Sequence, residues 1–257
     1  MKGFLQEYGI IMVVVAVVLG MLAFGKTGYA KSIQDAILGS ADHIVETGEN
    51  IVPKPAKASD IIEIEGTKYI VLEERENNQA LIITASSIGE KKFQSNYDHN
   101  TKLRPDGQNA STYEGSEIDN YLENTWYKGL SAKMKAAIQT TNIKQVLYTV
   151  RNDPNSKQET GPNGQVYNTI SRHVFLPGVE DINNVVNLKN VSKVQAFLNG
   201  TSIWTRDSHY RNEAEFLNSY LGSLTYTDVC NTVDVRPTFV IDLSKVDYTE
   251  VGHVDYK

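Results

Sequence analysis

The longest apolar stretch of the chain lies near its amino terminus and predicts a membrane anchor. The sixteen residues from Gly9 to Phe24 carry no charge and are rich in Val and Ile. A helix needs roughly 20 apolar residues to cross a bilayer, and extension to Phe4 and Tyr29 reaches that length. The extension includes Glu7 and Lys26, whose charged ends can reach the membrane interface. We therefore expect a single pass through the cell membrane.

A second apolar pattern follows the anchor and predicts an amphipathic stalk. Its apolar residues recur at near-helical spacing with polar residues between them, at Ile33, Ile37, Ile44, Val45 and Ile51. Such a face could pack on the domain, lie along the membrane or pack against sister subunits. Pro53 and Pro55 block a helix and favour an extended linker. The expected division is 1–30 for the anchor or pilin-like segment, 31–59 for the stalk and linker, and 60–257 for an extracytoplasmic domain.

From Asp60 onward the pattern changes to short β-rich runs separated by turn residues. Residues 61–64 and 68–72 predict a hairpin around Glu65–Gly66–Thr67, and residues 80–84 predict a third strand. Further strands are expected at 143–150, 172–176, 202–206, within 216–227, and at 236–243.

Helix signals are interleaved with these strands. Ser116 and Ser131 are positioned to cap short helices, the second over 132–139, and helical turns are expected at 179–186 and 192–198. Residues 91–111 and 151–164 are polar and rich in turn residues, which predicts loops. Because short strands and helices alternate without a βαβ rhythm, the pattern predicts an α+β domain rather than a parallel sheet.

Composition narrows the class of protein. The net charge of -6 argues against a nucleic-acid-binding protein, which needs a basic face. Cys230 is the single cysteine, so no intrachain disulfide forms, which suits a bacterial surface protein more than a eukaryotic one. Its sequence neighbours supply no base that would activate the thiol as a nucleophile.

Motifs for catalysis or for metal and cofactor binding are missing from the sequence. The five histidines are scattered without the spacing of metal ligands, and no glycine-rich phosphate loop is present. Asp98, Asp106 and Asp153 fall in predicted loops, but without the register of a calcium-binding loop. We therefore expect no catalytic residue, no metal and no cofactor.

The densest polar and aromatic cluster runs from Arg206 to Arg211, in a predicted loop. Loops on a rigid scaffold are where binding residues usually lie, although a solvated loop is the alternative. The candidate ligand-binding residues are Trp204, Arg206, Asp207, His209, Tyr210 and Arg211. Arg236 precedes Pro237, which holds it extended, so that its guanidinium can donate to buried carbonyls or a carboxylate. We assign Arg236 and Pro237 structural roles, and Trp204 has a structural alternative.

The amino terminus resembles the leader junction of Flp-type (tight-adherence) pilins, where a glycine precedes a short spacer, Glu-Tyr and an apolar helix. Gly3, Glu7 and Tyr8 occupy the corresponding places, with a spacer one residue shorter. The resemblance implies that Glu7 and Tyr8 serve subunit assembly. Three states of the amino terminus stay open: uncleaved, cleaved after Gly3 as a pilin, or cleaved after Ala30 as a secretory signal.

The remainder resembles a clostridial-type bacterial surface domain of unknown function. The matching segments are GTKYIVLEERENNQALIIT from residue 66, GSEIDNYLENTWY from residue 115, Val174–Leu176, Trp204–Arg206 and Val235–Leu243. This layout is similar to C-type-lectin-like domains, including those of the formylglycine-generating type. The resemblance implies a compact α+β fold in which the Trp204 strand and the Arg236 strand lie side by side and the loops form a binding face.

Together these features predict a membrane-anchored or pilus-associated bacterial surface protein that binds a ligand without catalysis. The expected partners are the membrane, sister subunits or pilus components, and an extracellular carbohydrate or protein. The flanking lysines are nearly balanced, and we place the domain outside the cell because the pilin and signal interpretations both expect this. The alternatives are a structural pilin-like filament subunit and an extracytoplasmic enzyme of the formylglycine-generating type.

Overall fold

The computed structural model describes residues 56–148, 159–160 and 166–257. Of these residues, 42% lie in strands and 19% in helices, so the fold is mainly β and the expected α+β class is wrong. In the described part of the chain, no helix is long and apolar enough to cross a membrane. The predicted anchor and most of the predicted stalk and linker lie outside the described residues.

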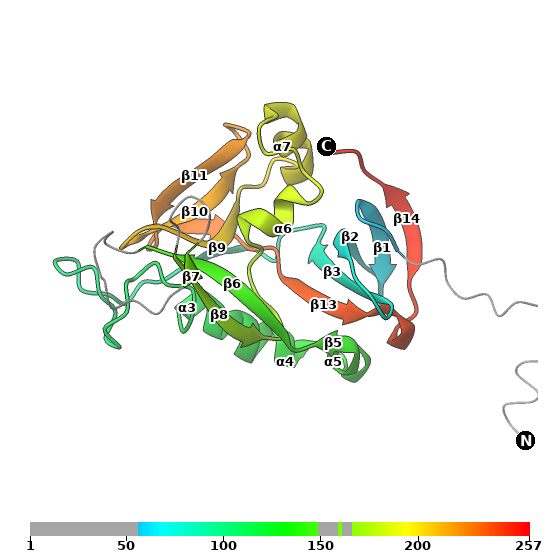
Figure 1. Ribbon diagram of the computed structural model, residues 1–257, viewed down its shortest axis with the longest axis horizontal. Coiled ribbons are helices and arrows are strands. Elements are labelled where there is room, and N and C mark those ends of the chain that lie inside the picture. The colour runs from blue at the N-terminus through cyan, green and yellow to red at the C-terminus, as the bar shows by residue number, and fades with distance from the viewer. Residues whose placement is uncertain (1–55, 149–158, 161–165) are drawn as a thin grey trace, which may run out of the picture. The chain divides into compact units, whose positions relative to one another are not determined.

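A six-stranded antiparallel sheet forms one part of the domain (Figure 1). Its order is β14 (Thr249–His253), β1 (Asp60–Ile64), β2 (Thr67–Glu74), β3 (Gln79–Thr84), β13 (Thr238–Asp242) and β5 (Ile138–Gln139). The predicted β1–β2 hairpin is confirmed. Its turn places Glu65 and Gly66 at φ values of 49° and 78°, the left-handed pair that matches the twist of a two-residue hairpin.

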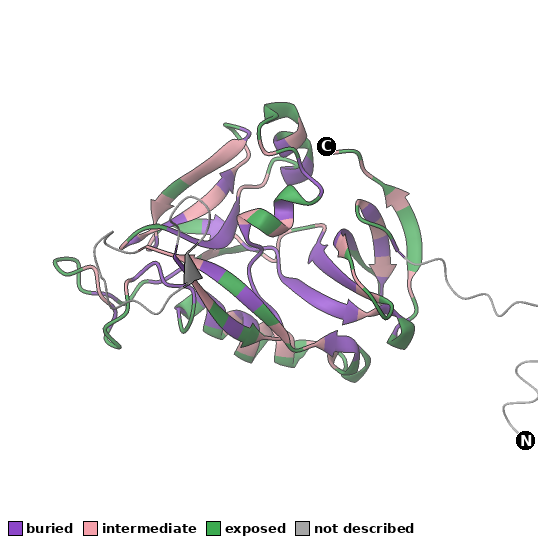
Figure 2. Cartoon of the chain, viewed as in Figure 1, coloured by how far each residue is buried: buried purple, intermediate pink, exposed green. Residues whose placement is uncertain are grey.

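Two neighbouring strands of this sheet, β3 and β13, are buried on both faces. Figure 2 shows β3 and β13 buried over nearly their whole length. Their sequences, ALII and TFVI, are continuous rather than alternating, as expected for strands that are covered on both sides. Edge strand β14 was not predicted, because its residues are mostly exposed and show no apolar alternation.

Two smaller sheets complete the strand arrangement. The five-stranded sheet has the order β11 (Ser223–Asp228), β10 (Glu213–Asn218), β9 (Ile203–Tyr210), β12 (Thr232–Asp234) and β4 (Glu90–Lys92). The three-stranded sheet has the order β6 (Thr141–Leu147), β8 (Val166–Arg172) and β7 (Glu159–Thr160). The pairings are antiparallel except between β9 and β12, which meet as a parallel pair at Ile203 and Asp234.

The helices are short. One continuous helical segment consists of α3 (Glu117–Tyr121), a π-helix (Leu122–Trp126) and α4 (Tyr127–Gly129), and α5 (Ala132–Ala137) follows it. The predicted caps are confirmed, because Ser116 Oγ accepts from the Asp119 amide and Ser131 Oγ from the Met134 amide. The other helices are α6 (Val179–Asn183), α7 (Val191–Leu198) and a 3₁₀ turn (Leu243–Lys245). Of these, α6 contacts both β2 and β9, so it lies between the two larger sheets.

Two expectations about strands are wrong. The strand expected at 172–176 is displaced, because β8 ends at Arg172 and only Phe175 continues, through an isolated bridge to Thr238. The strand that carries Trp204 does not lie beside the strand that follows Arg236. The first is β9 of the five-stranded sheet, whereas the second is β13 of the six-stranded sheet. The lectin-like arrangement is therefore not found.

Two consecutive buried side chains connect the small sheets and helix α6. Arg206 on β9 donates from Nε to the Lys144 carbonyl on β6 (2.5 Å) and from Nη1 to the Leu176 carbonyl (3.0 Å), and it pairs with Asp181 of α6. Asp207 accepts from the Val146 amide on β6 (3.1 Å) and from the Val179 amide at the start of α6 (2.7 Å).

The guanidinium of Arg206 packs directly on Gly178. A Cβ atom at residue 178 would stand 2.7 Å from Cζ of Arg206, closer than real Cβ contacts allow. A residue with a Cβ at this position would therefore have to displace the Arg206 guanidinium from its hydrogen-bond partners.

Arg236 makes a second buried connection, between the six-stranded sheet and α7. It is 1% exposed and donates from Nε to the Thr84 carbonyl (2.5 Å) and from Nη1 to the Phe197 carbonyl (3.1 Å). Its guanidinium also lies over the Phe197 ring, 4.6 Å from the centroid. Burial lowers the pKa of Arg236 to about 10, so the side chain stays charged at neutral pH. No acidic side chain in the described part of the chain lies within salt-bridge distance of it.

We predict that Arg236→Ala lowers the free energy of unfolding by about 3–5 kcal/mol, because it leaves two buried carbonyls unpaired and opens a cavity. Arg236→Met keeps most of the volume and should cost less. Urea unfolding followed by circular dichroism measures both. The matched control is Arg75→Ala, which removes a half-exposed pair with Glu73 and should change stability by less than about 0.5 kcal/mol. Equal effects of Arg236→Ala and Arg75→Ala would contradict the structural role.

Candidate functional site

The cluster that the sequence placed in a loop lies on strand β9, so that expectation is wrong. Trp204, Arg206, Asp207 and Ser208 are buried, and only His209 and Tyr210 at the end of the strand are exposed. Arg211 follows in the turn to β10. The polar residues suggested a loop because charged side chains are rarely buried unless they are paired, and here they are paired. Trp204, Arg206 and Asp207 therefore hold the fold and do not face solvent.

The two exposed members of the cluster lie on opposite faces of the sheet. The His209 ring stacks on Tyr226 of β11, with ring centroids 3.6 Å apart and an angle of 4° between the ring planes. The Tyr210 ring contacts Tyr148, with centroids 4.5 Å apart. The structure thus separates His209 from Tyr210 instead of bringing them to one binding surface.

Glu215 on β10 joins the His209 side of the sheet and was not predicted from the sequence. Its carboxylate lies 3.9 Å from Nδ1 of His209. Burial raises the pKa of Glu215 to about 7, and the negative charge of Asp207 adds to the effect. Glutamate at this position looks like an ordinary alternating strand residue in the sequence, so its burial next to another carboxylate could not be foreseen.

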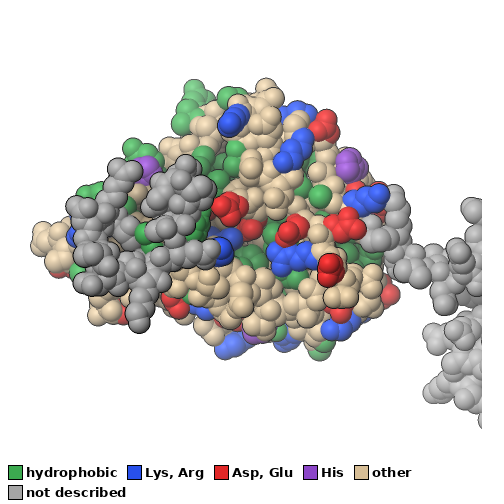
Figure 3. Space-filling model, viewed as in Figure 1, with side chains coloured by type: hydrophobic (Ala, Val, Ile, Leu, Met, Phe, Trp, Pro, Cys, Tyr) green, Lys and Arg blue, Asp and Glu red, His purple; other side chains and the backbone are tan. Residues whose placement is uncertain are grey.

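Exposed apolar side chains gather at the tip of the β10–β11 hairpin, next to α7 (Figure 3). Tyr220 is 88% exposed there, and Leu221 and Val191 are about half exposed. The tip is held against the helix because Gln195 donates to the Tyr220 carbonyl (3.0 Å). A small apolar patch of this kind is common on protein surfaces, and a hollow in the same sheet is the stronger candidate for a binding site.

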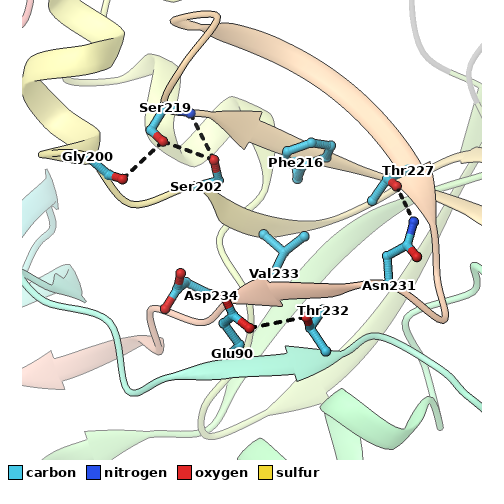
Figure 4. A pocket seen from close by; sticks show the side chains of 10 residues that line it. All are labelled: Glu90, Gly200, Ser202, Phe216, Ser219, Thr227, Asn231, Thr232, Val233 and Asp234. Atoms are coloured by element: carbon cyan, nitrogen blue, oxygen red, sulfur yellow. Dashed lines mark hydrogen bonds between the residues drawn. The ribbon is translucent and has the colours of Figure 1, made fainter.

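A polar pocket opens on the amino-terminal side of the single register pair between β9 and β12. Its volume is about 490 Å³, within the usual range for small-molecule sites. Figure 4 shows side chains from strands β4, β10, β11 and β12 and from the connections before β9, β11 and β12 around this hollow. The polar lining consists of hydroxyl, amide and carboxylate groups, from Ser202, Ser219, Thr227, Asn231, Thr232, Glu90 and Asp234.

The acidic groups of the pocket are Glu90 and Asp234, which stand directly opposite each other on β4 and β12. Each accepts one hydroxyl: Glu90 from Thr232 (3.2 Å) and Asp234 from Ser87 (2.6 Å). The described lining contains no Lys, Arg or His. The pocket therefore presents carboxylate oxygens and hydroxyls that can serve a ligand rich in hydrogen-bond donors.

The apolar part of the lining is Phe216 with Val233, and Figure 4 shows both directed into the hollow. Phe216 packs edge-to-face against Trp204, its cross-strand neighbour on β9, with ring centroids 6.0 Å apart. The Trp204 indole donates to the Lys91 carbonyl (2.9 Å). Trp204 thus has a role near the pocket, because it supports a ring of the pocket without lining it.

The described residues offer no activated thiol. Cys230 lies beside Asp228, whose carboxylate accepts from the Cys230 amide (2.9 Å). The hydrogen bond to Asp228, followed by burial, raises the pKa of the Cys230 thiol, which opposes the thiolate that a nucleophile needs. Within the described ranges, no group of three or more His, Cys, Asp or Glu residues is placed to hold a metal ion.

The pocket could not be located from the sequence. Its lining residues come from separate segments spread between residues 90 and 234. In the sequence, the hydroxyl residues among them look like ordinary turn and strand residues. The sequence predicts strand structure within residues 216–227, which include Phe216. Nothing in the sequence pattern predicts that residue 90 lies close to Phe216, Gly200 or Ser202.

The raised pKa of Glu215 predicts a pH-dependent stability. The folded protein holds this proton more tightly than the unfolded chain, whose ordinary pKa is 4.5. The stabilisation is therefore complete below about pH 4.5 and is lost as the pH rises through about 7. Glu215→Gln should remove this loss and raise the free energy of unfolding at pH 8 by roughly 1–3 kcal/mol. Urea unfolding across this range measures it, with exposed Glu74→Gln as the control. Parallel curves for Glu215→Gln and wild type would contradict the assignment.

Comparison with known proteins identifies the family. No curated protein and no solved structure matches the chain. A family model described as a domain of unknown function (DUF6273) matches residues 77–243. The match runs from the turn before β3 to the end of β13, so it includes the five-stranded sheet and the residues that line its pocket. The expectation of a domain of unknown function is confirmed at this level, while the clostridial origin and the individual motifs stay predictions. The chain belongs to the DUF6273 family of domains of unknown function.

Proposed function

We propose that the folded domain is a non-catalytic module that binds a carbohydrate in the polar pocket between β9 and β12. The observation that carries the proposal is the lining itself, in which hydroxyl, amide and carboxylate side chains surround one aromatic ring. A carbohydrate offers many hydroxyl donors to such acceptors and an apolar ring face to an aromatic side chain.

The geometry of the carboxylates supports binding of hydroxyl groups. Each ionised carboxylate can accept several hydrogen bonds, and Glu90 and Asp234 each accept one side-chain hydroxyl from within the protein. The remaining lone pairs are free for a ligand. Two carboxylates across a bound sugar could also hydrolyse it, so release of new reducing ends is the outcome that would contradict a binding-only role.

The surface location also belongs to this proposal. The apolar run from Gly9 to Phe24 supports attachment of the chain to the cell membrane, with the domain outside the cell. An exported domain meets polysaccharides of its own or neighbouring cells. Association with a pilus through Glu7 and Tyr8 stays a prediction from the sequence.

We predict that the domain binds at least one neutral oligosaccharide from a panel of cello-, chito- and malto-oligosaccharides, measured by isothermal titration calorimetry. Glu90→Gln and Asp234→Asn keep side-chain volume but weaken the acceptors, and each should lower affinity about tenfold or more. Glu74→Gln is the matched control, because Glu74 is an exposed carboxylate of β2 outside the pocket. Binding that survives both pocket variants would contradict the assigned site.

We predict that the full-length chain sediments with membranes and resists washing with high salt. Deletion of residues 9–24 should move it to the soluble fraction, because the deletion removes the apolar run. Amino-terminal sequencing of the membrane fraction then identifies a start at Met1, Phe4 or Lys31.

A separate variant, Glu7→Ala, should abolish filament assembly if the chain is a pilin-like subunit. An intact full-length chain found free in the cytosol would contradict the surface location.

A further inference from the structure

A second pocket lies on the other large sheet, between the β1–β2 turn, the end of β3 and the end of α4. Its volume is about 560 Å³. Its lining differs from that of the polar pocket, because it contains Tyr69, Trp126, Leu130 and Ile88 and no acidic residue. The lining also contains Lys68 and four hydroxyl residues, Thr67, Thr84, Ser86 and Ser87, so polar groups lie beside the aromatic side chains. A pocket of this size lies within the usual range for small-molecule sites.

Two aromatic rings form one wall of this second pocket. Tyr69 and Trp126 both pack on Phe239 of β13, with ring centroids 5.6 Å and 6.0 Å from it. Trp126 is the last residue of the π-helix. Such wide turns are rare in proteins and are found frequently at functional sites. Here the wide turn occurs in the segment that carries Trp126 to the pocket.

The pocket also has a buried hydroxyl without a partner. Thr84 is 3% exposed and lines the pocket, yet its Oγ1 has no hydrogen-bond partner among the residues that the structure describes. Its backbone is fully used, because its amide donates to the Pro237 carbonyl (3.0 Å) and its carbonyl accepts from Arg236 (2.5 Å). Thr84 pairs directly with Tyr69 across β2 and β3, so the two side chains share one face of the sheet.

An unpaired buried hydroxyl in a native fold calls for an explanation, since nearly all such groups have partners. A ligand group that pairs with Thr84 would enter through the pocket that this residue lines, beside the two aromatic rings. An aromatic ligand satisfies both conditions, because its ring packs on Tyr69 and Trp126 while a polar atom on its leading edge reaches Oγ1.

We propose that this second pocket binds a small, neutral aromatic molecule that carries a hydroxyl group on its ring. The ring lies against Tyr69 and Trp126, and its hydroxyl forms a hydrogen bond with Thr84. The proposal rests on other observations than carbohydrate binding, because the two pockets share no lining residue, although Ser87 of the second pocket donates to Asp234 of the polar pocket (2.6 Å).

The test is a titration of the ¹⁵N-labelled full-length chain in detergent with phenol, at measured free concentrations. The chain has two tryptophans and therefore two indole N–H signals. The chemical shift of the Trp126 indole N–H should change with phenol concentration and reach a plateau. The Trp204 signal should stay in place, because that indole is fully buried and bonded to the Lys91 carbonyl (2.9 Å), so it serves as the internal control.

Two changes remove the proposed hydrogen bond in different ways. Thr84→Val keeps the shape of the side chain and should weaken phenol binding about tenfold, whereas Thr84→Ser should retain it. Anisole, which cannot donate, should bind the unchanged protein more weakly than phenol. Absence of a saturable Trp126 shift, equal binding of phenol by Thr84→Val and Thr84→Ser, or movement of both indole signals would each overturn the proposal. If Thr84→Val fails to fold, the comparison of anisole with phenol decides.

Discussion

Three separate sheets share one domain, and the contact between the two smaller ones depends on a buried arginine and the aspartate that follows it. Arg206 and Asp207 project to opposite sides of β9, yet both reach β6 and the start of α6. A buried charge is costly unless it is paired and hydrogen-bonded, and here each charge has several partners. Strand β9 keeps one register pair with β12, and the polar pocket lies beside that pair.

Local signals in the sequence predicted local structure well. The hairpin at Glu65–Gly66 and the caps at Ser116 and Ser131 form as expected, because each depends on residues within four positions of one another. The predicted α+β class is wrong because the helix signals in the sequence mark only short helices that connect the strands of three sheets. Strands β4, β12 and β14 were missed, since strands that are very short or exposed lack the apolar alternation on which prediction relies.

The site was harder to predict than the fold, and for a different reason. Arg206, Asp207 and His209 form a polar run that is typical of a loop, and only the distant Lys144, Val146 and Asp181 explain why two of them are buried. Both pockets are lined by segments that lie far apart in the chain, such as residues 84 and 126. No spacing rule connects such residues, whereas Arg236 before Pro237 could be interpreted from its neighbour alone.

The close contact between Arg206 and Gly178 links two positions that are 28 residues apart in the chain. A side chain at residue 178 would have to displace the guanidinium from its partners, so a larger residue there favours a shorter one at residue 206. A shorter residue would in turn release the Lys144 and Leu176 carbonyls and the carboxylate of Asp181. Across homologous sequences, the residues at positions 178 and 206 should therefore vary together. An arginine at position 206 should be accompanied by a glycine at position 178.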